Sequence, residues 1–101
     1  MLSKYIIVKT GAILFNKLTT HSQVGATFPK VYAAGFCNIE FDSTGRHVVT
    51  CTGASESLNI KSIPPLDEFI IRDTLTKVSQ IEYLGLDVEQ MYDDYHASHS
   101  T

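Results

Sequence analysis

The segment from Val31 to Thr52 constrains the fold most strongly, because its pattern is that of a β-hairpin. Two runs rich in β-branched and aromatic residues flank Asp42-Ser43-Thr44-Gly45, where the glycine can supply the left-handed residue of a tight turn. Pairing Asp42 with Arg46 segregates apolar from polar side chains, whereas a slip of one residue mixes them on both faces. This register pairs, on the apolar face, Phe41 with His47, Ile39 with Val49 and Cys37 with Cys51.

The residues after this hairpin continue the pattern. Residues 52–56 have the composition of a turn, and Ser57 to Lys61 alternates like a half-buried strand, with Leu58 and Ile60 on one side. An antiparallel third strand here extends the same apolar face. We therefore expect this face to include Phe41, Leu58 and Ile60 together with the two cysteines.

An earlier hairpin is predicted at the N-terminal end. Strand-forming residues at 4–9 and 12–15 flank Thr10-Gly11, and a type I turn with a glycine bulge sets Ile7 opposite Ile13 and Tyr5 opposite Phe15. Both faces of this hairpin are apolar, which is typical of strands that are central or covered on both sides. Together these segments predict a mainly antiparallel sheet of about five strands.

Two helices are predicted to pack with this sheet. Pro65 suits a first helical position, Asp67 and Glu68 favour the helix dipole in the first turn, and apolar residues recur at helical spacing, so we expect a packed helix near 65–77. Asp87 can cap a short C-terminal helix, with Leu86 and Met91 at the spacing of a hydrophobic staple. The fold class is therefore α+β. Thr20 and Gln23 have the spacing of a capping box, which fits either a short helix or a loop.

The chain length of 101 residues suits one domain. We expect a single α+β domain over residues 1–95 and a disordered tail over 96–101. No apolar run approaches the roughly 20 residues that span a bilayer, and none resembles the core of a signal peptide, so the expected location is the cytoplasm, with no membrane association. Cys37 and Cys51 are then expected as thiols.

Charge is distributed unevenly along the sequence. Residues 1–61 carry a net charge of +3 and residues 62–101 a net charge of −6. Solvated helices account for this split, and so does an acidic surface that docks on a basic partner. Because no basic stripe suited to a phosphate backbone is present, nucleic-acid binding is not expected.

Residues capable of chemistry do not form a coherent catalytic set. The two cysteines have no C-x-x-C spacing, and their pairing fits small apolar core side chains better than a redox pair. His96 and His99 lack further metal ligands, and the 52–57 loop lacks the lysine of a phosphate-binding motif. The sequence therefore favours a non-catalytic protein with no cofactor and no metal.

Two functional hypotheses follow. The first is a protein-interaction or assembly module, self-association included, in which a helical stripe contacts a partner or else packs on its own sheet; the stripe comprises Val88, Met91, Tyr92 and Tyr95. The alternative is a small ligand-binding protein or enzyme with a site near His47 and the 52–57 loop, in which Ser55 and Ser57 supply hydroxyl groups. The sequence identifies no partner, ligand or biological process.

Overall fold

The structure is a computed structural model that describes all residues except 1, 17, 78–86 and 100–101. Its main sheet is four-stranded and antiparallel in the order β2-β1-β3-β4, formed by β1 (Leu2–Val8), β2 (Gly11–Phe15), β3 (Ala33–Phe41) and β4 (His47–Thr52). A small second sheet joins β5 (Ala54–Ser55) and β6 (Ile60–Lys61). The helices are α1 (His21–Gly25), α2 (Pro64–Lys77) and α3 (Val88–His99). The α+β class is confirmed, and the strands divide between a four-stranded sheet and a two-stranded one.

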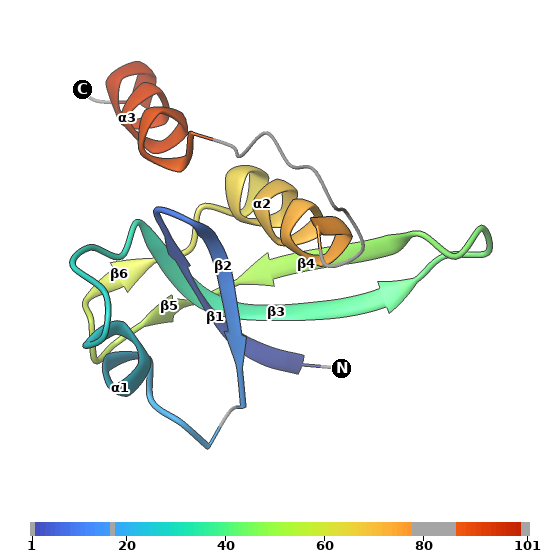
Figure 1. Ribbon diagram of the computed structural model, residues 1–101, viewed down its shortest axis with the longest axis horizontal. Coiled ribbons are helices and arrows are strands. Elements are labelled where there is room, and N and C mark those ends of the chain that lie inside the picture. The colour runs from blue at the N-terminus through green and yellow to red at the C-terminus, as the bar shows by residue number, and fades with distance from the viewer. Residues whose placement is uncertain (1, 17, 78–86, 100–101) are drawn as a thin grey trace.

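The main sheet is covered on both faces. Helices α2 and α3 lie over one face, and α1 lies on the opposite side, at the end where β5 and β6 are found (Figure 1). Central strand β1 therefore buries consecutive side chains, and Tyr5, Ile6 and Ile7 are each 0% exposed. One core cluster contains Tyr5, Ile7, Ala33, Cys37, Val49, Cys51, Ile63, Ile70, Ile71, Val88 and Tyr92; the other is built on Ile6, Val8 and Ala34.

The β3–β4 hairpin has the predicted register, with Cys37 opposite Cys51 and Phe41 opposite His47. The Asp42 N–H donates to the Arg46 carbonyl at 3.0 Å, and Gly45 takes the left-handed conformation with φ of 82°. The Asp42 carboxylate also accepts from the backbone N–H groups of Thr44 and Arg46. Local turn chemistry and face segregation thus agree in this hairpin.

The predicted register of the N-terminal hairpin is wrong by one residue. Tyr5 lies opposite Leu14, and Ile6 lies opposite Ile13, because Lys9 and Thr10 form a two-residue loop between Val8 and Gly11. Gly11 has a positive φ, as expected, but no extra bulge residue is inserted. Since both faces of β1 are buried, the hydrophobic pattern could not distinguish these registers.

The predicted third strand of the shared apolar face is also wrong. Ile60 pairs with Ser55 in the small sheet, and Leu58 and Ile60 pack with the second core cluster, on the face opposite the cysteines. Phe41 lies on the cysteine face, as predicted, but it is 68% exposed near the end of the hairpin and so adds little to the buried core. Strands of two residues carry too little alternation to fix the face that they cover.

Helix α2 confirms the predicted helix at 65–77 and begins one residue earlier. It runs across one face of the sheet, from the outer strand β4 to the outer strand β2. Near its start, a Glu68 carboxylate oxygen accepts from the Cys51 N–H of β4 at 2.8 Å. Farther along, the Thr74 hydroxyl accepts from the Ala12 N–H of β2 at 3.1 Å. The helix therefore satisfies one backbone donor on each of these strands.

The other two helices begin with the predicted caps. The capping box of Thr20 and Gln23 is present at α1, and Asp87 accepts from the Gln90 N–H at 3.1 Å at α3. Leu86, the other half of the predicted staple, lies outside the described residues. Over the described ranges, no helix combines the length and apolar content needed to cross a bilayer.

Helix α3 continues through His99, whereas the sequence predicts a disordered tail from residue 96. The His99 ring stacks on Tyr95 at 4.0 Å between centroids, and its Nδ1 lies 2.8 Å from the Tyr95 carbonyl oxygen. The Ser98 hydroxyl donates to the carbonyls of Asp94 and Tyr95. These contacts add side-chain hydrogen bonds to carbonyl groups one turn before the end of the helix.

Candidate binding groove

A buried carboxyl group, that of Asp67, joins α3 to the rest of the core. Asp67 lies in the first turns of α2 and is 0% exposed. Its Oδ1 accepts from the Tyr92 hydroxyl at 2.5 Å, and its Oδ2 accepts from the Tyr5 hydroxyl and from the Ile63 N–H, the latter at 2.8 Å. We call these four residues the Asp67 centre. It links β1, α2 and α3 at one point.

Burial governs the protonation of the Asp67 centre. Burial raises the pKa of Asp67 above 3.8, while hydrogen bonds from Tyr5, Tyr92 and Ile63 oppose that rise. Burial, reinforced by the Asp67 charge, also raises the pKa of Tyr5 and of Tyr92. Both tyrosines therefore remain protonated donors at neutral pH.

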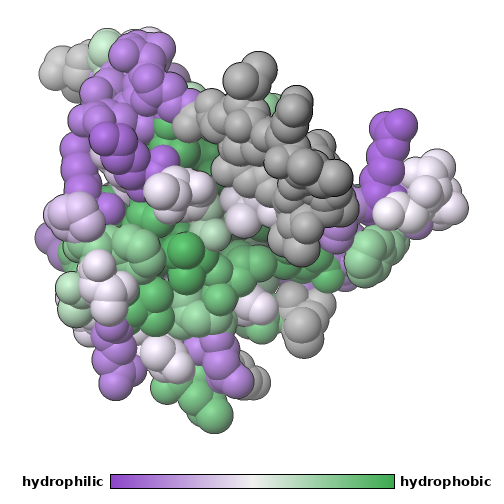
Figure 2. All heavy atoms as spheres, viewed as in Figure 1, coloured by the Kyte–Doolittle hydropathy of each residue, from purple (hydrophilic) through white to green (hydrophobic). Residues whose placement is uncertain are grey.

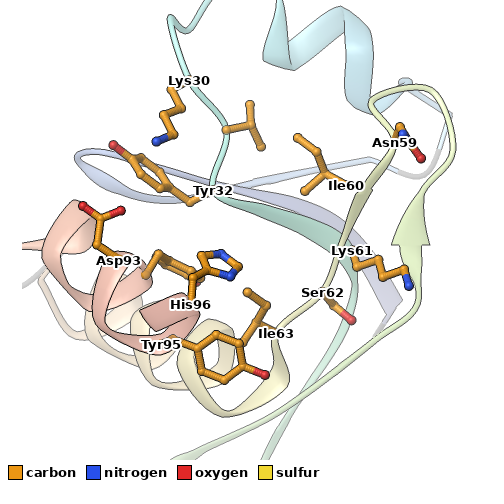
Figure 3. A pocket seen from close by; sticks show the side chains of 12 residues that line it. Lys30, Tyr32, Asn59, Ile60, Lys61, Ser62, Ile63, Asp93, Tyr95 and His96 are labelled. Atoms are coloured by element: carbon orange, nitrogen blue, oxygen red, sulfur yellow. The ribbon is translucent and has the colours of Figure 1, made fainter. Parts of the chain in front are cut away.

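Tyr92 also forms part of a surface groove of about 470 Å³. Its ring stacks on Tyr32, with 5.7 Å between centroids and 29° between planes, and the Lys30 amine lies 4.7 Å from the Tyr32 ring centroid. Residues from three segments line the groove: Lys30 to Tyr32 before β3, Asn59 to Ile63 around β6, and the α3 residues Tyr92, Asp93, Tyr95 and His96. Figure 3 shows the His96 ring pointing into the space between Tyr32 and Ile63. The walls are thus largely aromatic and aliphatic.

Charged groups surround this apolar interior. Lys30 and Lys61 come from the segments facing α3, and Asp93 comes from α3 itself. Partial burial raises the pKa of Tyr32, and the carboxylates of Glu89 and Asp93 add to this effect. Hydrophilic side chains cover the visible outer surface of α3 (Figure 2). The groove therefore combines apolar walls with a polar rim, as protein-binding sites do.

The residues of the predicted partner-binding stripe differ in how deeply they are buried. Val88 and Tyr92 are each 1% exposed and belong to the protein's own core. Met91 and Tyr95 pack partly against that core, and Tyr95 also lines the groove. Most of the stripe thus packs on its own sheet, and its outer edge contributes to the groove.

The three residues of the predicted ligand site are not gathered into one pocket. His47 packs beside the Phe41 ring at 4.8 Å, at the end of β4 far from the 52–57 loop. Thr52 lies five positions farther along the chain, which corresponds to about 16 Å along a strand. Ser55 is 1% exposed and accepts from the Leu58 N–H, while Ser57 accepts from the Ser22 N–H. These two hydroxyls hold the 52–62 region and α1 together.

The cysteines are unpaired thiols facing each other across β3 and β4. Burial raises the pKa of Cys37 to about 11 and that of Cys51 to about 12. A thiol with such a pKa is a thiolate to about one part in 10⁴ or less at neutral pH, and thiolate is the reactive form. These groups therefore have the properties of core side chains.

We expect neither thiol to react with iodoacetamide in the native protein at neutral pH. Exposures of 0% for Cys37 and 2% for Cys51 exclude the reagent, and the raised pKa values suppress the nucleophile. Mass spectrometry should show two adducts only after denaturation. The exposed control Ser43→Cys, in the β3–β4 turn, should gain one adduct at once, and rapid labelling of either native cysteine would contradict the prediction.

Sequence reasoning missed the most important polar group of this region. Asp67 has the spacing of the apolar face, three and four residues before Ile70 and Ile71, so a carboxyl inside an apolar stripe was the available signal. Lys30 and Tyr32 gave no comparable signal, because no motif relates them to α3. Within the described part of the chain, no group of three His, Cys, Asp or Glu side chains could hold a metal ion.

Comparisons of this chain with protein-family models, curated proteins and solved structures give no match.

Proposed function

We propose that this protein is a non-catalytic protein-binding module whose groove between α3 and the segments 30–32 and 59–63 receives a peptide segment of a partner. The observation that carries the proposal is the aromatic groove itself, with Tyr92 anchored to Asp67 and stacked on Tyr32. Because the hydrogen bond to Asp67 fixes the position of Tyr92, the aromatic wall that Tyr92 forms with Tyr32 is already in place before a partner binds. Such preorganisation lowers the entropic cost of association.

The lining supports binding rather than catalysis. Tyrosine is enriched in the centres of protein interfaces, and Tyr32 and Tyr95 line the groove, with the buried ring of Tyr92 stacked against Tyr32. Ser62, which supplies a hydroxyl to the described lining, already donates it to the Gly53 carbonyl at 2.7 Å. His96 lies edge-on to the Tyr95 ring. This geometry does not pair a nucleophile with a base, which covalent catalysis would require.

The cations on the wall opposite α3 favour an acidic side chain in the partner segment. Lys30 and Lys61 lie on that wall, whereas Asp93 and the nearby carboxylates of Glu89 and Asp87 make the α3 side acidic. A peptide with an apolar side chain for the interior and a neighbouring carboxylate near Lys30 fits this arrangement. Complementary charge at a rim raises specificity and the association rate more than affinity.

A library of random peptides displayed on phage tests the proposal. Selected peptides should share an apolar residue next to aspartate or glutamate, and their synthetic versions should shift the NMR signals of the groove residues. Lys30→Glu should weaken binding about tenfold, equivalent to about 1.4 kcal/mol. The matched charge reversal Arg46→Glu, in the distant β3–β4 turn, should leave the affinity unchanged. Failure to select a consensus, or signal changes away from the groove, would refute the proposed site.

A further inference from the structure

Strand β4 presents an outer edge to which no other described strand is paired, because the main sheet ends there in the order β2-β1-β3-β4. The Cys51 N–H points outward and binds Glu68. Backbone groups two residues apart on an antiparallel strand point the same way, so the N–H and C=O of Val49 and His47 also face outward. This edge can accept another strand.

The same edge exposes an apolar side chain. Val48 is 44% exposed and lies on the sheet face opposite the cysteines, between Arg46 and Thr50. The β3–β4 hairpin projects away from the other elements at this end of the sheet (Figures 1 and 2). Edge strands are commonly protected by proline, bulges or inward-pointing charges. Residues 47–50 contain no proline and no Asp, Glu, Lys or Arg, and their pairing with β3 is continuous, without a bulge.

We propose that two copies of this chain associate by antiparallel pairing of their β4 strands about a two-fold axis at Val48. In this register, His47 of each copy exchanges backbone hydrogen bonds with Val49 of the other, and the two Val48 side chains face each other. Val48 then occupies a non-hydrogen-bonded position, where opposed side chains are closest. The isologous arrangement is the commonest form of homodimer.

Glu68 selects this register. Its carboxylate occupies the outward Cys51 N–H at 2.8 Å, so a paired strand cannot continue past Val49 toward Cys51 without displacing it. The pairing is thereby confined to residues 47–49 of each copy. A register centred on Val49 would place His47 against Cys51 and compete directly with Glu68.

Charge complementarity supports a second copy as the occupant. Glu40 lies opposite Val48 on β3, and both Glu40 and Arg46 are exposed on the Val48 face. In the proposed register, Glu40 of one copy lies two strand spacings across and two residues along from Arg46 of the other, about 12 Å away, a gap that the two side chains span when both are extended. The two-fold axis generates this opposite-charge contact twice.

Cysteine cross-linking tests both the dimer and its register. Val48→Cys should form a covalent dimer under mild oxidation, visible on a non-reducing gel and reversed by thiol reductant. Thr50→Cys is the matched control, because the two Thr50 positions are offset by about 13 Å along the strands, beyond the reach of a disulfide. No cross-link at Val48, or an equal one at Thr50, would overturn the proposal.

A charge exchange gives an independent check on the unmodified chain. Light scattering over a dilution series should show a dimer whose dissociation constant rises at least fivefold in Arg46→Glu and recovers in the double variant Glu40→Arg with Arg46→Glu. A monomer at every concentration, as expected if β4 binds a different protein, would overturn the dimer. So would an Arg46→Glu variant that dimerises normally. Peptide binding at the groove is a separate measurement, so either proposal can fail alone.

Discussion

Asp67→Ala is expected to lower the free energy of unfolding by about 3–9 kcal/mol. The substitution removes the acceptor of the Tyr5 and Tyr92 hydroxyls and of the Ile63 N–H, and each buried donor left unpaired costs about 1–3 kcal/mol. A domain of this size has a total stability of about 5–15 kcal/mol, so the loss is a large fraction of it. Urea denaturation followed by circular dichroism measures the change.

The control for this experiment is Glu56→Ala, in an exposed turn, which should change stability by less than about 0.5 kcal/mol. A loss below about 1 kcal/mol for Asp67→Ala would show that the donors find other partners. Tyr92→Phe distinguishes the contribution of Tyr92 to stability from that of Tyr5, because it keeps the ring in the core and removes only the Tyr92 hydroxyl donor. Its expected cost is smaller than that of Asp67→Ala.

The same carboxyl predicts a pH dependence of stability. Because burial raises the pKa of Asp67 in the folded state above 3.8, the folded protein holds this proton more tightly than the unfolded chain does. The resulting stabilisation is fully present below the unfolded value of 3.8 and is lost as the pH rises through the folded pKa. Relative to Asp67→Asn, which cannot titrate, the wild type should gain stability on acidification. A constant difference between about pH 3 and pH 7 would contradict this expectation.

Deletion of residues 87–101 is expected to unfold most of the protein. This deletion removes the buried side chains of Val88 and Tyr92, each contributing about 1.5–3 kcal/mol, and it leaves Asp67 without one of its donors. The summed loss approaches the total stability of a small domain. Circular dichroism and the dispersion of NMR signals would reveal the loss of tertiary structure.

Deletion of residues 97–101 is the matched control, because the described side chains in that range are exposed. The melting temperature of this shorter variant should lie within a few degrees of that of the intact chain. If the longer deletion instead remained cooperatively folded, α3 would be an appendage on the core, and the groove would lose its fixed wall.

Elements whose local signals agree with one another could be predicted from the sequence. The β3–β4 register follows from a glycine turn and from alternation that leaves one clean solution. The capping residues Thr20 and Asp87 likewise bind the amides that their spacing indicates. In each case the determining contacts lie within a few residues of one another.

The remaining features depend on contacts between distant segments. The predicted face of Leu58 and Ile60 is wrong because a strand of two residues takes its orientation from the elements around it. From the sequence, Asp67 is expected to be a surface residue in the first turn of a helix. It is buried because the fold places two distant side chains against it: Tyr5, 62 residues away, and Tyr92, 25 residues away. The groove could not be predicted for the same reason, since Tyr32 and Tyr92 meet only in the folded chain.

These separations have a consequence for the order of events during folding. The β1–β2 and β3–β4 hairpins close short loops, whereas the bond from Asp67 to Tyr5 closes a loop of 62 residues at a greater entropic cost. The Asp67 centre should therefore assemble after the rate-limiting step, with φ-values near zero at Tyr92. Weakening this centre would then shorten the lifetime of the native state while leaving the refolding rate almost unchanged.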